Sequence, residues 1–494
     1  MRFLIFLFMI LLGPGLAAED KVAAPNGEPI ATATSAASPK PVCPMGSLCS
    51  KNPSLSSDWA DQMSNLDLMQ DEMKNLKITN PRVSVSVIDT GAAKEIANER
   101  GRGRVSYNPV TQDNDLVDAW DDKAQHGTAV TETIRRLAPG DVNIFYTGQK
   151  SAKDGLKKGE LDRAVEQACD KSKDKNKDSV KIVNVSWNSE DQGHTFVDSQ
   201  SLYKRMMAQG CVVFIAAGNS GGVNKDHFTS TEAIDRSGKK ALLPNGKMAT
   251  EGNLLAPGDR IPVQLTAHPA DLNQCNNQTY EISGSSLAAP ETTAVGKNVA
   301  EVLSRTEEFR HLEPAKQAEL IEQIVKMSAV NRRLDGYRAV KLAEQASENV
   351  SAALSDLRGT ARFAWQRIPQ NVRIHNAAND SCYEQSDCGK RMTCYSDKRR
   401  YLAAVGPSSR EGQKAIQDLF VTAQNSGDYE LAQNWASQLK GVSKSEMDRL
   451  VDWNEFRKRT GSAADASLVV DYLTSVLPFM SVPADIQKRF LNVK

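Results

Sequence analysis

Short apolar, β-branched runs alternate with amphipathic runs between residues 142 and 216, and this alternation restricts the fold more than any other feature of the chain. It predicts strands at residues 142–146, 182–186 and 211–216, with helices at residues 159–171 and 201–208. Such alternation is typical of a parallel sheet with helices on both faces. The fold class is therefore predicted as α/β, with a mostly parallel central sheet and its ligand crevice at the carboxyl ends of the strands.

Polar side chains stand where three of the predicted strands end. Asp89 closes an apolar run that begins at Val83, and Ser186 closes the run at residues 182–186. Asn219 follows the strand at residues 211–216, in a glycine-rich turn. Because parallel strands end at one edge of a sheet, we expect these three residues to share a cleft.

Residues 281–290 form a small-residue turn that runs directly into an alanine-rich helical pattern and places Ser286 at its start. Unpaired backbone N–H groups and the positive end of the helix dipole would favour an oxyanion beside its hydroxyl. Ser286 is therefore a candidate nucleophile. Taken alone the motif is weak, since most such tripeptides are turns or helix caps.

A histidine and a carboxylate precede Ser286 in a definite order. His126 opens a helical pattern at residues 126–134, downstream of Asp89. A serine hydroxyl needs an imidazole to take its proton, and the imidazole needs a carboxylate to fix its tautomer. Asn219 adds an amide that can donate a hydrogen bond to an oxyanion.

These four segments resemble the active-site blocks of the subtilases, the subtilisin-like serine endopeptidases, whose triad follows the order Asp, His, Ser. Asp89 matches the family aspartate in Asp-Thr-Gly, and His126 the histidine in His-Gly-Thr. Ser286 matches the nucleophile in Gly-Thr-Ser-x-Ala-x-Pro, and Asn219 the oxyanion asparagine in Ala-Ala-Gly-Asn. The resemblance covers roughly residues 58–345 and implies a three-layer sandwich.

Three positions beside the motifs depart from the family pattern. Ser285 replaces the usual threonine, Ala129 a frequent second histidine, and Glu291 a frequent histidine after the proline. None of these changes removes a reacting group.

Substrate-binding residues are implied by the same resemblance. Ser186, Trp187 and Asn188 occupy the place of the family's Ser-Leu-Gly segment, and Gly218 precedes the oxyanion asparagine. Glycine is used where another backbone approaches closely, so Asn188 puts the ordinary shape of the specificity pocket in doubt. The alternative interpretation is an ordinary turn at a strand end.

The resemblance implies a serine endopeptidase that works through an acyl-enzyme intermediate on protein or peptide substrates. The alternative is a catalytically silent, subtilase-like module that binds peptides or a partner. No cofactor is expected to be required. Structural calcium is conceivable at the aspartates of residues 113–122, but a solvated acidic loop is the favoured interpretation because no complete ligand pattern is visible.

Residues 1–18 have the charged start, short apolar centre and small-residue end of a secretory signal. Residues 19–57 contain few large apolar side chains and are predicted to be a flexible leader. Cleavage of the signal would leave no stable membrane anchor and a secreted or periplasmic protein. Lys plus Arg and Asp plus Glu number 61 each, and this balance gives no sign of a nucleic-acid partner.

Eight cysteines suit an oxidising compartment, although the sequence does not determine their pairing. Cys43 with Cys49 is the most local pair. Cys275 could tie the C-terminal region to the segment before Ser286. A zinc site at Cys382, Cys388 and Cys394 is disfavoured by their spacing, and no metal site is predicted.

Residues 350–494 resemble no family that we recognise. Apolar stripes at residues 416–423 and 431–439 predict a helical hairpin, and residues 468–477 another helix. We predict a small, mainly helical C-terminal domain. Its role is either ordinary packing or partner docking.

Overall fold

The fold is known from a computed structural model of the 494-residue chain. The residues that it describes are 58–78, 81–89, 105–109, 126–138, 140, 142–146, 159–170, 180–186, 196–264, 279–357, 382, 388–425 and 428–440. The expected signal and leader, the aspartates of residues 113–122, and Trp187 and Asn188 lie outside these ranges. So do Cys43, Cys49, Cys275 and the helix expected at residues 468–477.

Among the described elements, strands and helices alternate between residues 105 and 216, and strands then follow one another up to residue 282. The strands are β1 (Val85–Asp89), β2 (Val105–Pro109), β3 (Val142–Tyr146), β4 (Lys181–Val185), β5 (Cys211–Ala216), β6 (Thr229–Ile234), β7 (Leu254–Pro257), β8 (Ile261–Gln264) and β9 (Thr279–Ile282). The helices are α2 (Asp58–Met63), α3 (Leu66–Asn75), α5 (His126–Leu137), α6 (Glu160–Cys169), α7 (Ser199–Ala208), α8 (Ser285–Leu303), α9 (Glu307–Arg310), α10 (Pro314–Ser328), α11 (Gly336–Glu348), α12 (Val350–Leu357), α14 (Cys388–Val405), α15 (Arg410–Asn425) and α16 (Tyr429–Ala436).

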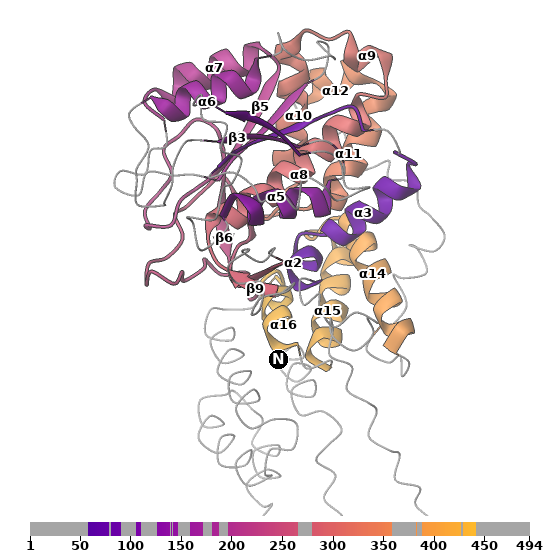
Figure 1. Ribbon diagram of the computed structural model, residues 1–494. Coiled ribbons are helices and arrows are strands. Elements are labelled where there is room, and N and C mark those ends of the chain that lie inside the picture. The colour runs from indigo at the N-terminus through magenta and orange to yellow at the C-terminus, as the bar shows by residue number, and fades with distance from the viewer. Residues whose placement is uncertain are drawn as a thin grey trace, which may run out of the picture.

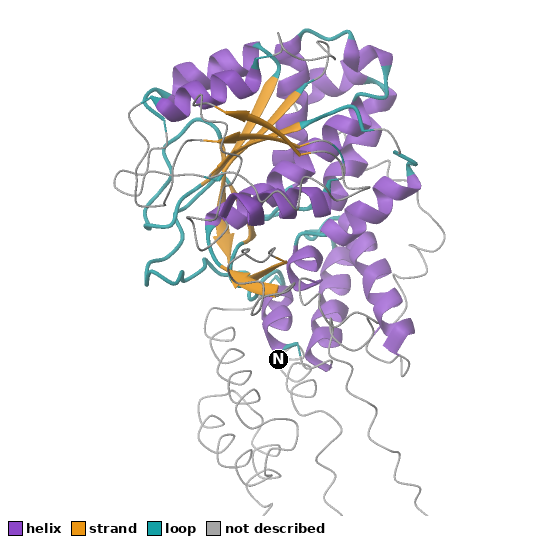
Figure 2. Ribbon diagram, in the orientation of Figure 1, coloured by secondary structure: helices purple, strands orange, loops and turns teal. Residues whose placement is uncertain are grey.

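Seven strands form one sheet in the order β2-β3-β1-β4-β5-β6-β7, and every neighbouring pair is parallel. Figure 2 shows this sheet enclosed by helices. β8 and β9 pair separately as an antiparallel ribbon. The predicted α/β class is confirmed, and β1 is an interior strand of the sheet, between β3 and β4.

Helices cover both faces of the sheet because its side chains are apolar on both. Val87 of β1 points into a hydrophobic cluster shared with α5, α8, α10 and α11, whereas Ile88 points into a second cluster with α6 and α7. This period of two is the normal alternation of a strand. Figure 1 shows α6 and α7 on one side of the sheet and α5 and α8 on the other.

Every residue of α8 is buried, so this helix lies in the interior of the protein. Small residues let it approach the sheet closely: a Cβ on Gly296 would lie 2.4 Å from the Phe214 ring. Its buried Glu301 pairs with Lys297 and accepts hydrogen bonds from the backbone N–H groups of Arg82 and Val83, which lead into β1. The helix that begins at the candidate nucleophile thus also anchors the strand that carries Asp89.

The chain before β1 forms two consecutive helices, α2 and α3, with a break between them. The chain turns at Asn65, whose φ of 51° is left-handed, a conformation that asparagine adopts more readily than most residues. The free carbonyl of Ser64 accepts a hydrogen bond from Gly336 N at 2.8 Å. The break therefore docks α2 and α3 onto the start of α11.

The C-terminal helices have a hydrophobic core of their own, centred on Leu419, Phe420 and Trp435, and the predicted helical hairpin is present as α15 and α16. The division of the chain near residues 345–350 stays a prediction, and Val350 and Ala353 of α12 pack in the core beneath the sheet. The core unit therefore continues to the end of α12.

Two disulfides lie within the described residues. Cys169 at the end of α6 pairs with Cys211 at the start of β5, and Cys382 pairs with Cys394 of α14. The second pair uses two of the three sulfurs of the zinc alternative, so these two are not available as thiolate ligands. None of the helices in the described ranges is both long and apolar enough to cross a membrane.

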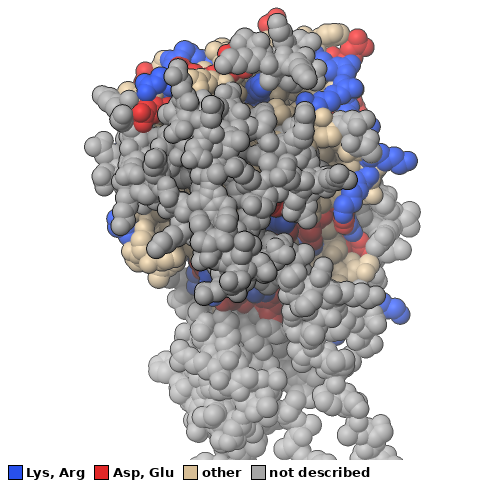
Figure 3. Space-filling view, in the orientation of Figure 1, with Lys and Arg blue, Asp and Glu red and all other residues tan. Residues whose placement is uncertain are grey.

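Charged side chains of both signs are interspersed over the described surface. Figure 3 shows Lys and Arg beside Asp and Glu on the face that it draws. This mixing agrees with the zero formal net charge of the chain.

Candidate active site

Asp89 and His126 form a pair at the carboxyl edge of the sheet. Asp89 is the last residue of β1 and is fully buried, and His126 is the first residue of α5. The His126 Nδ1 atom lies 2.7 Å from Asp89 Oδ1. A carboxylate accepts hydrogen bonds only, so this pairing assigns the ring proton to Nδ1. The lone pair of the imidazole then lies on Nε2, which is the basic atom of the ring.

Ser286 is the second residue of α8 and is almost completely buried. Its position in the first turn leaves nearby backbone N–H groups without helical acceptors. Asn219 follows β5 and Asp89 ends β1 in the same parallel sheet, so the two residues lie at the same edge. Among the described residues, the predicted site residues Asp89, Asn219 and Ser286 thus lie toward that edge, with α5 and α8 packed together beneath them.

Two contacts orient the Asn219 amide. Its Oδ1 accepts hydrogen bonds from Ser285 N at 2.9 Å and from Ser285 Oγ at 3.0 Å. A backbone N–H can only donate, so this bond identifies the oxygen and leaves Nδ2 as the donor on the other side. A Cβ on Gly284 would lie 3.0 Å from Ser286 Oγ and 3.4 Å from Asn219 Nδ2. A hydroxyl and an amide donor therefore border the space beside Gly284.

Ser285, which stands where the family usually has threonine, supplies the same hydroxyl. Its Oγ accepts a hydrogen bond from Gly218 N at 2.9 Å and donates to Asn219. The carbonyl of Gly218 accepts from Thr250 N. Both polar backbone groups of Gly218 are therefore engaged within the protein, although this residue was expected to contact substrate.

Ser186 holds the backbone of the candidate nucleophile. Pro290 lacks the N–H that would normally bond the carbonyl of Ser286 in the helix. The Ser186 hydroxyl donates to that carbonyl instead, at 2.9 Å. Asn184 Nδ2 donates to Ser186 Oγ, and the Thr293 hydroxyl donates to Asn184 Oδ1, each at 2.9 Å. We expected Ser186 to contact substrate and missed this role, although a proline four residues after Ser286 was a signal for it.

Glu291 is a buried acid beside the site. It is fully buried, and neither carboxylate oxygen has a hydrogen-bond partner among the described residues. Burial raises the pKa of Glu291 well above its ordinary value of 4.5, and the nearby charge of Asp61 raises it further, against the opposing effect of Arg136. Asp61 of α2 is itself paired with Arg136 of α5. The Glu291 carboxyl therefore keeps its proton to a higher pH than an exposed glutamate.

Ser186 is the only residue of the expected Ser186–Trp187–Asn188 segment within the described ranges. Among the described residues, no three His, Cys, Asp or Glu side chains cluster in a way that could hold a metal ion. The aspartates considered for calcium are outside those ranges.

Comparisons with known proteins agree with the sequence motifs. A model of the subtilase family matches residues 80–354. No curated protein matches the chain. Among solved structures, the chain is similar to a cold-adapted subtilisin-like serine proteinase, with 18% identity over 52% of this chain and 89% of that one and a TM-score of 0.37. It is also similar to a protease from Pseudoalteromonas arctica PAMC 21717, with 18% identity over 59% and 98% of the two chains and a TM-score of 0.42.

Proposed function

The chain belongs to the subtilase family of serine-type peptidases, and from this premise we propose that Asp89, His126 and Ser286 are its catalytic triad in endopeptidase cleavage. Its substrates are proteins or peptides. The observation that carries the proposal is the 2.7 Å contact between His126 and Asp89 at the edge where Ser286 begins α8. The proposal is also supported by the space beside Gly284, which Ser286 Oγ and Asn219 Nδ2 both border.

The reaction proceeds in two halves. His126 Nε2 takes the proton of Ser286 Oγ while Oγ attacks the peptide carbonyl carbon. Asn219 Nδ2 and the Ser286 N–H donate to the oxyanion. The imidazolium then gives its proton to the leaving amine, and an acyl-enzyme ester remains. Water, deprotonated by His126, attacks the ester and releases the acid.

Replacement of the nucleophile tests this proposal. Ser286→Ala should lower kcat on a denatured protein substrate by about 10⁶-fold, the magnitude found when the nucleophile of subtilisin is removed. Ser283→Ala is the matched control, because the Ser283 hydroxyl donates to Asp259 and is not at the helix start. Parental activity in Ser286→Ala would refute the assignment.

We also propose that the protein is exported, on the signal pattern of residues 1–18. The disulfides Cys169–Cys211 and Cys382–Cys394 suit an oxidising compartment. Intact mass of protein recovered outside the cytoplasm should correspond to a chain without those residues. Protein retained inside with its N-terminus intact would contradict export.

For the C-terminal helices we infer an internal packing role rather than partner docking. Arg399 of α14 is buried and bonds the α2–α3 turn of the core unit. Leu68 of α3, Tyr337 of α11 and Ala403 of α14 form one apolar contact. Replacement of Arg399, described in the Discussion, tests this role.

A further inference from the structure

A cavity of about 40 Å³ lies between the core unit and the C-terminal helices. Its lining includes Arg333 and Arg338 from the start of α11 and the loop before it, and Arg399 from α14. One water needs roughly 10–15 Å³ of such space, so the cavity has room for about three waters or one small polyatomic ion.

The arginine side chains at the cavity differ in the groups that bond them. Arg399 bonds Asp67 through both terminal nitrogens. Asp335, the carboxylate that lines the cavity, caps α11 by accepting from Arg338 N at 2.9 Å. Arg333 instead donates to the neutral side chain of Asn434 and makes no ion pair with a described carboxylate. Among the described residues, no carboxylate therefore hydrogen-bonds the Arg333 guanidinium.

The buried Nε donors and the pKa shifts of Arg333 and Arg399 are consistent with this difference. The Nε atoms of Arg333 and Arg399 are buried and have no hydrogen-bond partner among the described residues. Burial lowers the pKa of Arg333 to about 10. Burial also acts to lower the pKa of Arg399, but the charge and hydrogen bonds of Asp67 outweigh it, and the net pKa is raised. The charge of Asp235 opposes the effect of burial on Arg333 without outweighing it, and Asp235 makes no ion pair with Arg333, whereas Asp67 hydrogen-bonds Arg399 directly.

We propose that this cavity binds a small oxyanion, of the size of inorganic phosphate, with Arg333 as its principal ligand. The planar fork of a guanidinium matches the spacing of oxyanion oxygens. Because the cavity walls come from both α11 and α14, a bound anion would bridge the core unit and the C-terminal helices. The site is separate from the Ser286 cleft and does not depend on the proposed chemistry.

Thermal unfolding of the full chain tests the proposal, with sodium phosphate exchanged for sodium chloride at constant ionic strength. The melting temperature should rise saturably, by about 3 °C once the site is filled. Arg333→Gln should remove this rise. Arg236→Gln is the matched control, since Arg236 pairs with Asp428 at the same junction but does not line the cavity.

A second variant keeps the test decisive if Arg333→Gln does not fold. Asn434→Asp would place a permanent carboxylate against Arg333, because the two side chains already contact each other. We expect a higher melting temperature without phosphate and no further saturable rise with it. A rise that is linear in phosphate, or equal in the parent and Asn434→Asp, would be a general salt effect and would overturn the proposal.

Discussion

The edge of the sheet at Ser286 and the junction with the C-terminal helices are both polar and buried, but they are built from different groups. Next to the Asp89–His126 pair, hydrogen bonds from the neutral side chains of Ser186 and Ser285 fix the start of α8 and the Asn219 amide. The junction consists largely of ion pairs. These pairs are Arg399–Asp67, Arg400–Asp71 and Arg236–Asp428.

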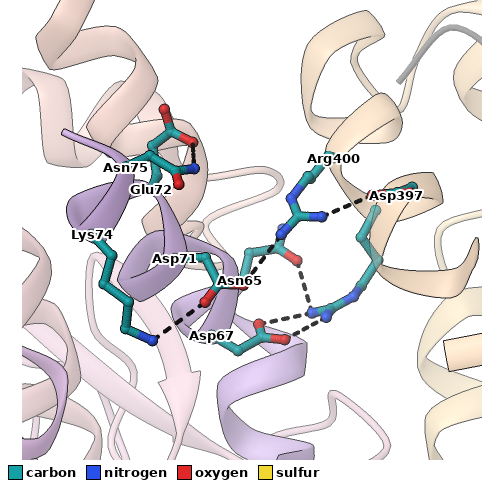
Figure 4. Close-up of polar contacts among 9 residues, drawn as sticks. Asn65, Asp67, Asp71, Glu72, Lys74, Asn75, Asp397 and Arg400 are labelled. Atoms are coloured by element: carbon teal, nitrogen blue, oxygen red, sulfur yellow. Dashed lines mark hydrogen bonds and ion pairs between the residues drawn. The ribbon is translucent and has the colours of Figure 1, made fainter. Parts of the chain in front are cut away.

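This difference separates two tasks. Hydrogen bonds between neutral groups fix the orientation of a side chain, whereas the strength of an ion pair depends on its burial and on the salt concentration. Figure 4 shows Arg400 of α14 bonded to Asp397 of the same helix and, across the junction, to Asp71 of α3. Changes at the sheet edge should therefore alter turnover with little effect on stability, and changes at the junction should do the opposite.

The largest expected effect is at the sheet edge. Asn219→Ala should lower kcat about 10²- to 10³-fold, because it removes one donor to the oxyanion. The control is Asn245→Ala, since Asn245 donates to the carbonyl of Asn219 and lies outside the reacting space. Steady-state kinetics on a short peptide substrate, with melting curves in parallel, measure both quantities. An undiminished kcat in Asn219→Ala would remove this residue from the site.

The next effect concerns stability at the junction. Arg399→Met should lower the free energy of unfolding by about 2 to 3 kcal/mol, because the charged bonds of a buried guanidinium are lost. Arg400→Met should cost less than about 1 kcal/mol, since Arg400 is partly exposed. Urea unfolding measures both, and hydrolysis of a short peptide should stay within about twofold of the parent. Equal losses in the two variants would contradict an internal packing role for Arg399.

A smaller effect tests the buried acid next to the sheet edge. Because the folded-state pKa of Glu291 is raised, its contribution to stability is full below 4.5 and is lost as pH rises through the folded value. Glu291→Met removes this titration and should stabilise the fold by about 1 to 2 kcal/mol at pH 8, and by less at pH 4. Melting curves at the two pH values measure the difference. A gain that is the same at both would show that Glu291 titrates normally.

Much of the sheet could be predicted from the sequence, because β1, β3, β4 and β5 are apolar runs with helical patterns between them. β6 could not, since Thr229–Ile234 reads as a polar segment. It is buried because its polar groups find distant partners: Glu232 binds Arg332, and Thr231 binds Thr292. Those pairings exist only once the chain has folded.

For the candidate site too, the sequence predicts the local motifs but not the contacts between distant residues. Asp89, His126 and Ser286 could be predicted because their motifs are local in sequence. The bond from Ser186 to the Ser286 carbonyl spans 100 residues, and only the missing N–H of Pro290 indicated that a donor was needed. The break between α2 and α3 is bonded by Gly336, which is still more distant in sequence from its partner Ser64.

Reaction with a fluorophosphonate probe tests the central claim most directly, because only an activated serine is phosphonylated at an appreciable rate. We predict a single adduct on Ser286, found by peptide mapping, which is absent in Ser286→Ala and forms at least about 10³-fold more slowly in His126→Ala. A folded parent protein that is not labelled, or is labelled on a different serine, would contradict the account. So would a rate of labelling that does not change in His126→Ala.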